Sequence, residues 1–433
     1  MSGGHGLEQH ADTQRRVVRV LAASQVLGGI GAAAGAAVGA SLAADLATES
    51  LSGLSASASV IGSALMAIPV SRIMQQRGRR PGLAFAYLVG MAGAVVIVIG
   101  ALLDLFPLAL LGVVATGSGM TAGLQSRYAA TDLAAPGRRG RSLATVVWAT
   151  TIGSILGPNL AAPMGSLAGS IGIPRLAGPY LLTVVVYGAA AAIISLLLHP
   201  DPLLVARDTL AGPAARRAGL PGTRQLGGTG SPVKPGSVRD ALDTIRTSSA
   251  AVLGLASVVI GHAVMVAIMS MTPVHLQNEG ASLEIVGVII SAHITGMYIA
   301  SPLVGAAADR YGRQPVMVVG GGLLLAACAF AGTATGHAHA QLGIGLTLLG
   351  LGWSCTLIAG STLVTESVPV GERPSVQGST DLLMGIAGAS AGLASGLVVG
   401  FGSYALLSLI AACLVVPLIF RASRPLTARP ALS

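Results

Sequence analysis

The sequence is poor in charged and aromatic side chains. Of its 433 residues, only 9% are charged and 3% are aromatic, whereas about a quarter of the residues in a typical soluble domain are charged. So few charges cannot cover a water-facing surface, which excludes a soluble enzyme. A hydrophobic content of 53% excludes a disordered chain. The composition therefore predicts an integral membrane protein.

Cysteine is scarce as well. Cys328, Cys355 and Cys413 each stand alone inside an apolar run. They form no Cys-x-x-Cys pair and no disulfide framework, so we interpret them as small apolar packing residues. The sequence also contains no P-loop, catalytic triad or zinc signature. Neither direct ATP drive nor enzymatic activity therefore has support.

What the chain has instead is glycine, with 60 residues, and long apolar runs. Small side chains let membrane helices pack closely, and one span needs roughly 20 apolar residues. Runs of this length predict twelve spans, at 17–42, 51–71, 82–103, 107–130, 143–164, 177–198, 249–274, 284–307, 316–334, 341–365, 377–400 and 403–420. The sequence thus predicts an all-α protein with six spans in 1–198, a linker at 199–248 and six spans in 249–433.

The expected linker mixes Pro, Gly, Arg and Ser in aperiodic order. This composition predicts a flexible segment, with a short amphipathic helix at 236–247. A transport-silent sensor that recruits a protein through this linker is one hypothesis, but no recognisable binding module supports it.

The basic residues give the orientation. With the N-terminus placed inside, all 25 Lys and Arg residues except Arg175 fall on the inner side. Basic residues are retained in the cytoplasm, so we expect a multi-pass protein of the cell membrane with both termini and the linker cytoplasmic. The net charge of +9 has the same origin, so we expect the lipid bilayer as a partner and no nucleic acid. We expect a monomer.

Two matching loops indicate an internal repeat. QQRGRRP follows the second span at Gln75–Pro81, and DRYGRQP follows the eighth at Asp309–Pro315. A Gly-Arg-x-Pro turn at the same place in both six-span halves is typical of parallel repeats.

These loops resemble those of the major facilitator superfamily. The residues that carry the resemblance are Gly305, Asp309, Arg310, Gly312 and Arg313 in the second half, with Gly78 and Arg79 in the first. It implies the major facilitator fold, two six-helix bundles that work by alternating access. The glycines permit a tight turn, and Asp309 is expected to pair with an arginine in one gating state. Ser71 and Gln75 replace the Gly and Asp of the family pattern, so we expect the first-half gating pair to be altered or absent.

Ionisable residues inside spans are costly and informative. Every Asp and Glu near a span falls at a span end, among them Asp132, Asp309, Glu366 and Asp381 at the inner ends. A proton-coupled carrier commonly uses a deep carboxylate, so its absence counts against proton coupling, although a histidine relay stays open. Arg127 is expected to snorkel to the inner surface, or alternatively to assist proton transfer.

Two pairs of soft side chains lie deep in consecutive spans. Met265 and Met269 are four residues apart, as are His293 and Met297, so each pair occupies one helix face. Met265 and His293 should both lie about 14 Å below the outer surface, so we expect the pairs to face each other. Thioether and imidazole without carboxylates suit Cu(I). Ordinary packing of methionine and hydrogen bonding or proton relay by histidine are the alternatives.

The two pairs resemble those of the copper-importing, CcoA-like branch of the superfamily, and the flanking MTPVH and SPLVG fit that branch. The resemblance implies Met265 and His293 as the principal copper ligands and Met269 and Met297 as supporting ones. Copper would then be the transported substrate, with no resident cofactor required.

Other signals favour other functions. Gly153, Gly157 and Pro158, in GSILGP, resemble the glycine-proline motif of the antiporter branch and could thin or kink a helix. They imply the alternative, proton-coupled efflux of drugs or other small hydrophobic molecules. Four further polar residues either line a substrate cavity or form interhelical hydrogen bonds: Gln25, Gln125, Asn159 and His262.

Overall fold

The computed structural model describes residues 3–47, 53–210, 237–334 and 338–425. Helices make up this part of the chain, and it contains no strand. Twelve helical stretches in it are long and apolar enough to cross a membrane. The predicted all-α fold with twelve spans is confirmed.

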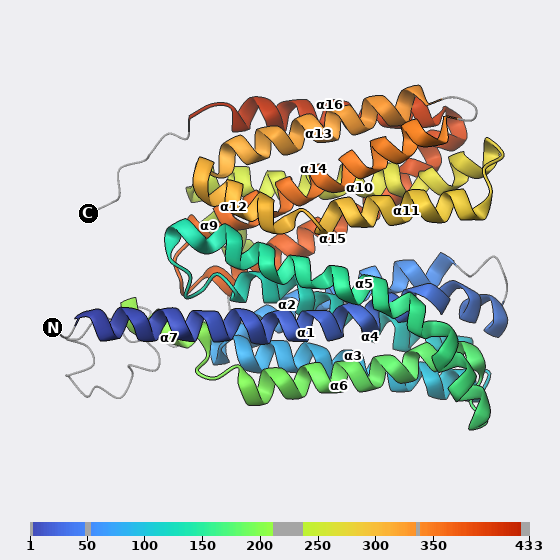
Figure 1. Cartoon of the computed structure of the whole chain (residues 1–433), viewed down its shortest axis with the longest axis horizontal. Helices are drawn as coiled ribbons and strands as arrows, with labels where there is room; N and C mark the ends of the chain where they lie inside the picture. Colours follow the sequence, from blue (N-terminus) through green and yellow to red (C-terminus); the bar gives the residue numbers. More distant parts are fainter. Residues whose placement is uncertain (1–2, 48–52, 211–236, 335–337, 426–433) are drawn as a thin grey trace. The chain divides into compact units, whose positions relative to one another are not determined.

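The helices of the first six spans overlap the predicted apolar runs, and α1 begins well before its run at 17–42. Figure 1 labels each of them. They are α1 (Gly3–Leu46), α2 (Gly53–Arg77), α3 (Arg79–Leu102), α4 (Phe106–Ala129), α5 (Arg139–Ser170) and α6 (Gly178–Leu197). Short 3₁₀ turns, η2 (Pro136–Arg138) and η3 (Arg175–Ala177), precede α5 and α6.

The last six spans are helical too, and the eighth consists of two helices. The elements are α10 (Ser249–Asn278), α11 (Leu283–Tyr298), α12 (Ser301–Tyr311), α13 (Arg313–Thr333), α14 (His339–Glu366), α15 (Arg373–Phe401) and α16 (Tyr404–Ala422). Pro302 stands in the first turn of α12, where its missing N–H costs nothing.

The linker contains one expected helix and one unexpected helix. Helix α9 (Val238–Thr247) confirms the amphipathic segment. Ser237 and Asp240 cap it reciprocally, and the hydrogen bonds from Ser237 lower the pKa of the Asp240 carboxyl. Helix α7 (Pro202–Leu210) was not expected. Residues 211–236 of the predicted flexible segment lie outside the described residues.

Contacts divide the chain into two compact units. Unit 1 comprises 1–135, 145–241 and 369–385, and unit 2 comprises 136–144, 242–368 and 386–433. The units differ from the expected halves in two places, because the start of α5 groups with unit 2 and the first part of α15 groups with unit 1.

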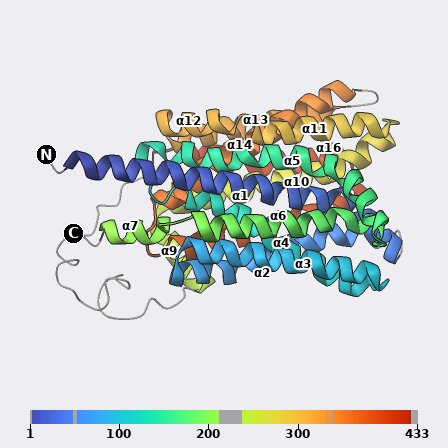
Figure 2. The same ribbon diagram turned by 60° about the horizontal axis from the view of Figure 1, so that its bottom comes forward.

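In unit 1, glycines make room for the few large aromatic rings. Helix α6 packs along α1 and α3 (Figure 2). Tyr87 and Tyr187 are buried there with ring centroids 5.7 Å apart in an edge arrangement. A Cβ at Gly31, Gly90 or Gly119 would collide with the Tyr187 ring. The glycines therefore allow the close packing that buries both rings.

In unit 2, α14 is the central helix. It packs against α10, α11 and α13, while α10 and α11 make few contacts with each other. Helix α16 lies along α13 (Figure 1). Of the free cysteines, Cys328 and Cys355 are buried as expected, whereas Cys413 is exposed. Cys413 stands in α16, one of the apolar stretches long enough to span a membrane, and its packing role stays a prediction.

Candidate functional site

The repeated loops form the same turn in both units. Gly78 and Gly312 each have φ of +96°, in a region that is essentially restricted to glycine. Each is followed by an arginine that pairs with an acid 53 residues further on, Arg79 with Asp132 and Arg313 with Glu366. The internal repeat is therefore present in the side-chain contacts as well as in the sequence.

In unit 2, Asp309 connects its loop to the start of α5. Its carboxylate oxygens accept hydrogen bonds from the backbone N–H groups of Gly140 and Arg141, both at 2.9 Å. Arg313 lies 3.1 Å from Asp309 and 2.7 Å from Glu366. The expected pairing of Asp309 with an arginine is confirmed, and its gating role stays a prediction. Arg310, the other basic residue of this loop, has its guanidinium 5.4 Å from the centre of the adjacent Tyr311 ring.

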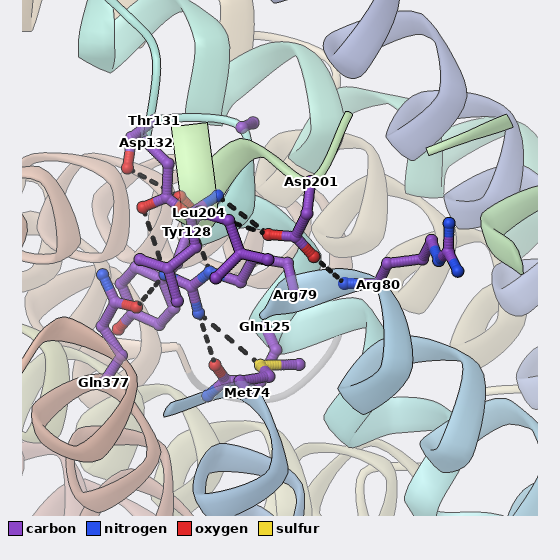
Figure 3. Close-up of polar contacts among 12 residues, drawn as sticks. Met74, Arg79, Arg80, Gln125, Tyr128, Thr131, Asp132, Asp201, Leu204 and Gln377 are labelled. Atoms are coloured by element: carbon purple, nitrogen blue, oxygen red, sulfur yellow. Dashed lines mark hydrogen bonds and ion pairs between the residues drawn. The ribbon is translucent and has the colours of Figure 1, made fainter. Parts of the chain in front are cut away.

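In unit 1, Arg79 is fully buried, and Figure 3 shows its polar contacts. Its Nε donates to Asp132 at 2.8 Å, and its Nη2 donates to the Gln377 side chain at 2.6 Å. Its Nη1 donates to Gln125 at 3.4 Å. The first-half loop thus has an ion pair, formed by Arg79 and Asp132. It differs from the second half, as expected, because Gln75 stands where Asp309 supplies an acid.

A second buried ion pair adjoins the first. Arg127 donates to Asp381 at 2.5 Å, and the Gln125 amide donates to the same carboxylate at 2.8 Å. The Arg127 and Asp381 side chains are only 2% and 1% exposed, so the expectation that Arg127 snorkels is wrong. Asp381 is a buried carboxylate in the third turn of α15, and not an exposed group at a span end. Together with Arg79 and Asp132, the four charges sum to zero.

His293 lies against α14. Its Nδ1 is 2.9 Å from the carbonyl oxygen of Leu346, and a carbonyl only accepts, so Nδ1 carries the proton. In the neutral imidazole, Nε2 is then an acceptor. Nε2 is buried and has no hydrogen-bond partner within the described part of the chain. The side chain is 1% exposed, and a buried unpaired acceptor in a native protein calls for a ligand or water.

The two predicted pairs of copper ligands lie on α10 and α11, which make few contacts with each other. Met265 and Met297 are both buried, with 8% exposure, while Met269 is half-buried. His293 and Met297 lie one turn apart on α11 where it packs on α14. Among the residues that the structure describes, no three His, Cys, Asp or Glu side chains gather into a metal site. The Met/His ligand set stays a prediction.

Aromatic side chains lie along the same side of α14. The Trp353 indole donates to Nδ1 of His262 at 3.2 Å, and Tyr298 meets the indole edge-on at 5.9 Å. Leu346, whose carbonyl binds His293, and Trp353 are seven residues apart, about two turns along α14. We call His262, His293, Tyr298 and Trp353 the α14 cluster. Sequence reasoning found both histidines but missed the aromatic pair, although Trp353 is one of only two tryptophans.

Gln25 and Asn159, like Gln125 above, form hydrogen bonds with other parts of unit 1. Gln25 on α1 donates to Thr150 on α5 at 2.8 Å, which is the interhelical alternative. Asn159 donates to the carbonyl of Ile155 in its own helix at 2.6 Å. Neither arrangement requires a bound solute.

The Gly-Pro element of α5 is a close-packing site. A Cβ at Gly153 would lie 2.7 Å from the Gly29 backbone, and one at Gly157 would lie 2.7 Å from Ala33. Helix α5 continues through Pro158. These glycines let α1 approach α5 closely, as expected. The role of this element in proton antiport stays a prediction.

Comparisons with known proteins agree with this architecture. Residues 253–432 match the family model described as Major Facilitator Superfamily. The chain is 36% identical over 415 residues to the uncharacterized MFS-type transporter YdeG of Bacillus subtilis, covering 95% of this chain and 92% of that protein. It is 27% identical over 377 residues to the riboflavin transporter RfnT of Brucella anthropi, covering 86% of each.

Solved structures share the fold. The proton:xylose symporter XylE has a TM-score of 0.69 at 16% identity, covering 95% of both chains. The human organic anion transporter MFSD10 has a TM-score of 0.68 at 17% identity, covering 94% of this chain and 99% of that one. Likeness at this level of identity concerns the fold alone.

Proposed function

The chain belongs to the major facilitator superfamily of transporters, and on this premise we propose that it carries a small organic solute with N–H or O–H donors. The cargo binds at the α14 cluster, and the two six-helix halves work by alternating access. The protein is a transporter and not an enzyme.

The observation that carries the proposal is Nε2 of His293. It is a buried hydrogen-bond acceptor that no described residue satisfies, held in place because Nδ1 is bound to the Leu346 carbonyl. A solute that donates a hydrogen bond there relieves the penalty of an unpaired buried group, about 1–3 kcal/mol.

The aromatic members of the cluster favour a flat solute. Trp353 and Tyr298 meet edge-on, and aromatic rings attract further rings by offset or edge-to-face packing. The relative from Brucella anthropi is named a riboflavin transporter, and a flavin has both a planar ring system and N–H and O–H donors. Riboflavin is therefore the first compound to test.

The test is riboflavin binding to purified protein, followed by quenching of flavin fluorescence. We expect His293→Phe and Trp353→Leu each to weaken binding about tenfold. His275→Gln is the control. His275 belongs to the same unit, but its ring stacks on Tyr404 and not on the α14 cluster, so this variant should bind riboflavin like the parent. If the parent does not bind riboflavin, this cargo is excluded.

Copper is the second candidate, and the tautomer of His293 favours it. A metal-bound imidazole usually donates its other N–H to a carbonyl or carboxylate, as His293 does to Leu346. Met297 lies one turn away on α11, and thioether with imidazole suits Cu(I). The proposed ligands remain Met265, Met269, His293 and Met297.

One pair of variants separates the candidates. Met265→Leu removes a proposed copper ligand but no member of the α14 cluster, whereas Trp353→Leu removes an aromatic face but no proposed metal ligand. Uptake of radioactive copper that is lost in Met265→Leu and His293→Ala, at matched membrane abundance, would support copper. Copper uptake in the variants equal to that of the parent would reject this ligand set, and a parent that takes up no copper would exclude copper as the cargo.

A further inference from the structure

The two repeated loops differ in one contact. Asp309 in unit 2 accepts hydrogen bonds from the start of α5, including the Gly140 N–H. The offset of the repeat pairs Asp309 with Gln75 and Gly140 with Pro374. Gln75 has no carboxylate, and Pro374 has no backbone N–H to donate. Unit 1 therefore lacks the acid and one of the two N–H donors that form the contact in unit 2.

Arg207, on the unexpected helix α7, lies at this place in unit 1. Its Nη1 donates to the backbone carbonyl of Gln75 at 2.9 Å, and its Nη2 donates to the carbonyl of Gly371 at 3.2 Å. Gln75 lies in the last turn of α2, where carbonyls lack helical partners, and Gly371 lies just before α15. One planar guanidinium thus joins the two segments, as its fork geometry allows.

Helix α7 is itself fixed to the α2–α3 turn. Asp201 is buried and accepts from the Arg80 N–H at 2.7 Å (Figure 3). Its other oxygen accepts from the N–H of Leu203 at 3.0 Å, at the start of α7. This anchor sets the position of α7 and so aims Arg207 at the two carbonyls.

We propose that Arg207 is the positioning residue that ties the end of α2 to the start of α15, in place of the contact that Asp309 makes in unit 2. Movement of the start of α15 then requires the guanidinium to release at least one carbonyl. The segment between the two six-span halves thereby takes part in the conformational cycle.

The test measures access to the start of α15. Ser375 is buried there. The reporter is Ser375→Cys in a background with Cys328, Cys355 and Cys413 changed to Ala, because its thiol becomes accessible when the start of α15 detaches. We expect Arg207→Gln to raise the rate of N-ethylmaleimide modification at least tenfold in detergent-solubilised protein. Arg207→Lys should give an intermediate rate, because a point charge replaces the fork. A rate for Arg207→Gln within twofold of the parent would overturn the proposal.

Two controls separate a local tie from general damage. Arg246→Gln removes a charge from the other linker helix, where the side chain is 73% exposed, and should leave the rate unchanged. In a second background that keeps only the buried Cys355, Arg207→Gln should leave this thiol protected. An equal rise at Cys355 would mean global loosening and would also overturn the proposal.

A rescue tests the equivalence with Asp309. Gln75→Asp with Pro374→Ala supplies the missing carboxylate and the missing N–H. Added to Arg207→Gln, these changes should restore slow modification of the cysteine at 375. Modification that stays fast would reject the equivalence.

Discussion

At the scale of single residues, Asp381 gives a sharp prediction. Its partner Arg127 is almost fully buried, so Asp381→Asn leaves a buried cation without its counter-charge. Breaking a buried ion pair from one side costs about 3–5 kcal/mol. We expect a matching loss of stability in thermal unfolding of the purified protein, with Asp243→Asn, in an exposed pair, changing little.

The double variant Arg127→Met/Asp381→Leu refines this prediction. Replacing both charges by apolar side chains removes the desolvation cost together with the attraction, which is often neutral for stability. We expect the double variant to be more stable than Asp381→Asn. A double variant that is less stable would show that the pair contributes net stability to unit 1.

The sequence could not predict this pair, for a physical reason. Arg127 and Asp381 are 254 residues apart, and each lies near the end of an apolar run, where a charged side chain normally reaches water. Only tertiary packing brings them together. Asp309 with Arg313 was predictable because the two are four residues apart on adjoining helix ends.

At the scale of elements, the repeated turn predicts a difference between its two copies. A residue other than glycine at φ near +96° costs about 1–3 kcal/mol. Gly312→Ala should lower the free energy of unfolding by this backbone strain alone, because the nearest neighbour of its Cβ is Pro315 at 3.7 Å. Gly78→Ala should cost more, because the Cβ would lie 2.5 Å from the Asp201 carboxylate.

Free energies of unfolding for the two variants provide the measurement. Gly322→Ala, in a helix where nothing lies within 4 Å of the Cβ, is the control and should stabilise by about 0.5–1 kcal/mol. Equal losses for Gly78→Ala and Gly312→Ala would mean that Asp201 moves aside freely, and the anchoring of α7 would be weaker than we infer.

The same elements show how far sequence reasoning extends. The spans and α9 follow from local hydropathy and amphipathic spacing, which depend on neighbours in the chain. Helix α7 was missed because contacts with the α2–α3 turn and with Gly371, both more than a hundred residues away in the chain, stabilise so short a helix. For the site, residue type picked out His293 and His262, whereas the free Nε2 depends on a carbonyl 53 residues away.

At the scale of the whole molecule, hydropathy gave the number of spans, because each span is one continuous segment. It could not give the grouping of the first part of α15 with unit 1, which depends on Gln377 and Asp381 meeting α3 and α4. Orientation is a different property, because it depends on the sum of many charges, and the charge distribution predicts it directly.

The orientation prediction concerns Arg175, the one basic residue expected outside. The two variants are Arg175→Cys and Arg246→Cys, each made in the background without native cysteines. Intact cells that express them are treated with a membrane-impermeant maleimide. Because basic loops are retained in the cytoplasm, Arg175→Cys should be labelled in intact cells and Arg246→Cys only after permeabilisation. The reverse pattern would place the basic linker outside. Arg207 would then act at the outer end of the protein, so this labelling also fixes the side of the membrane on which α7 holds α15.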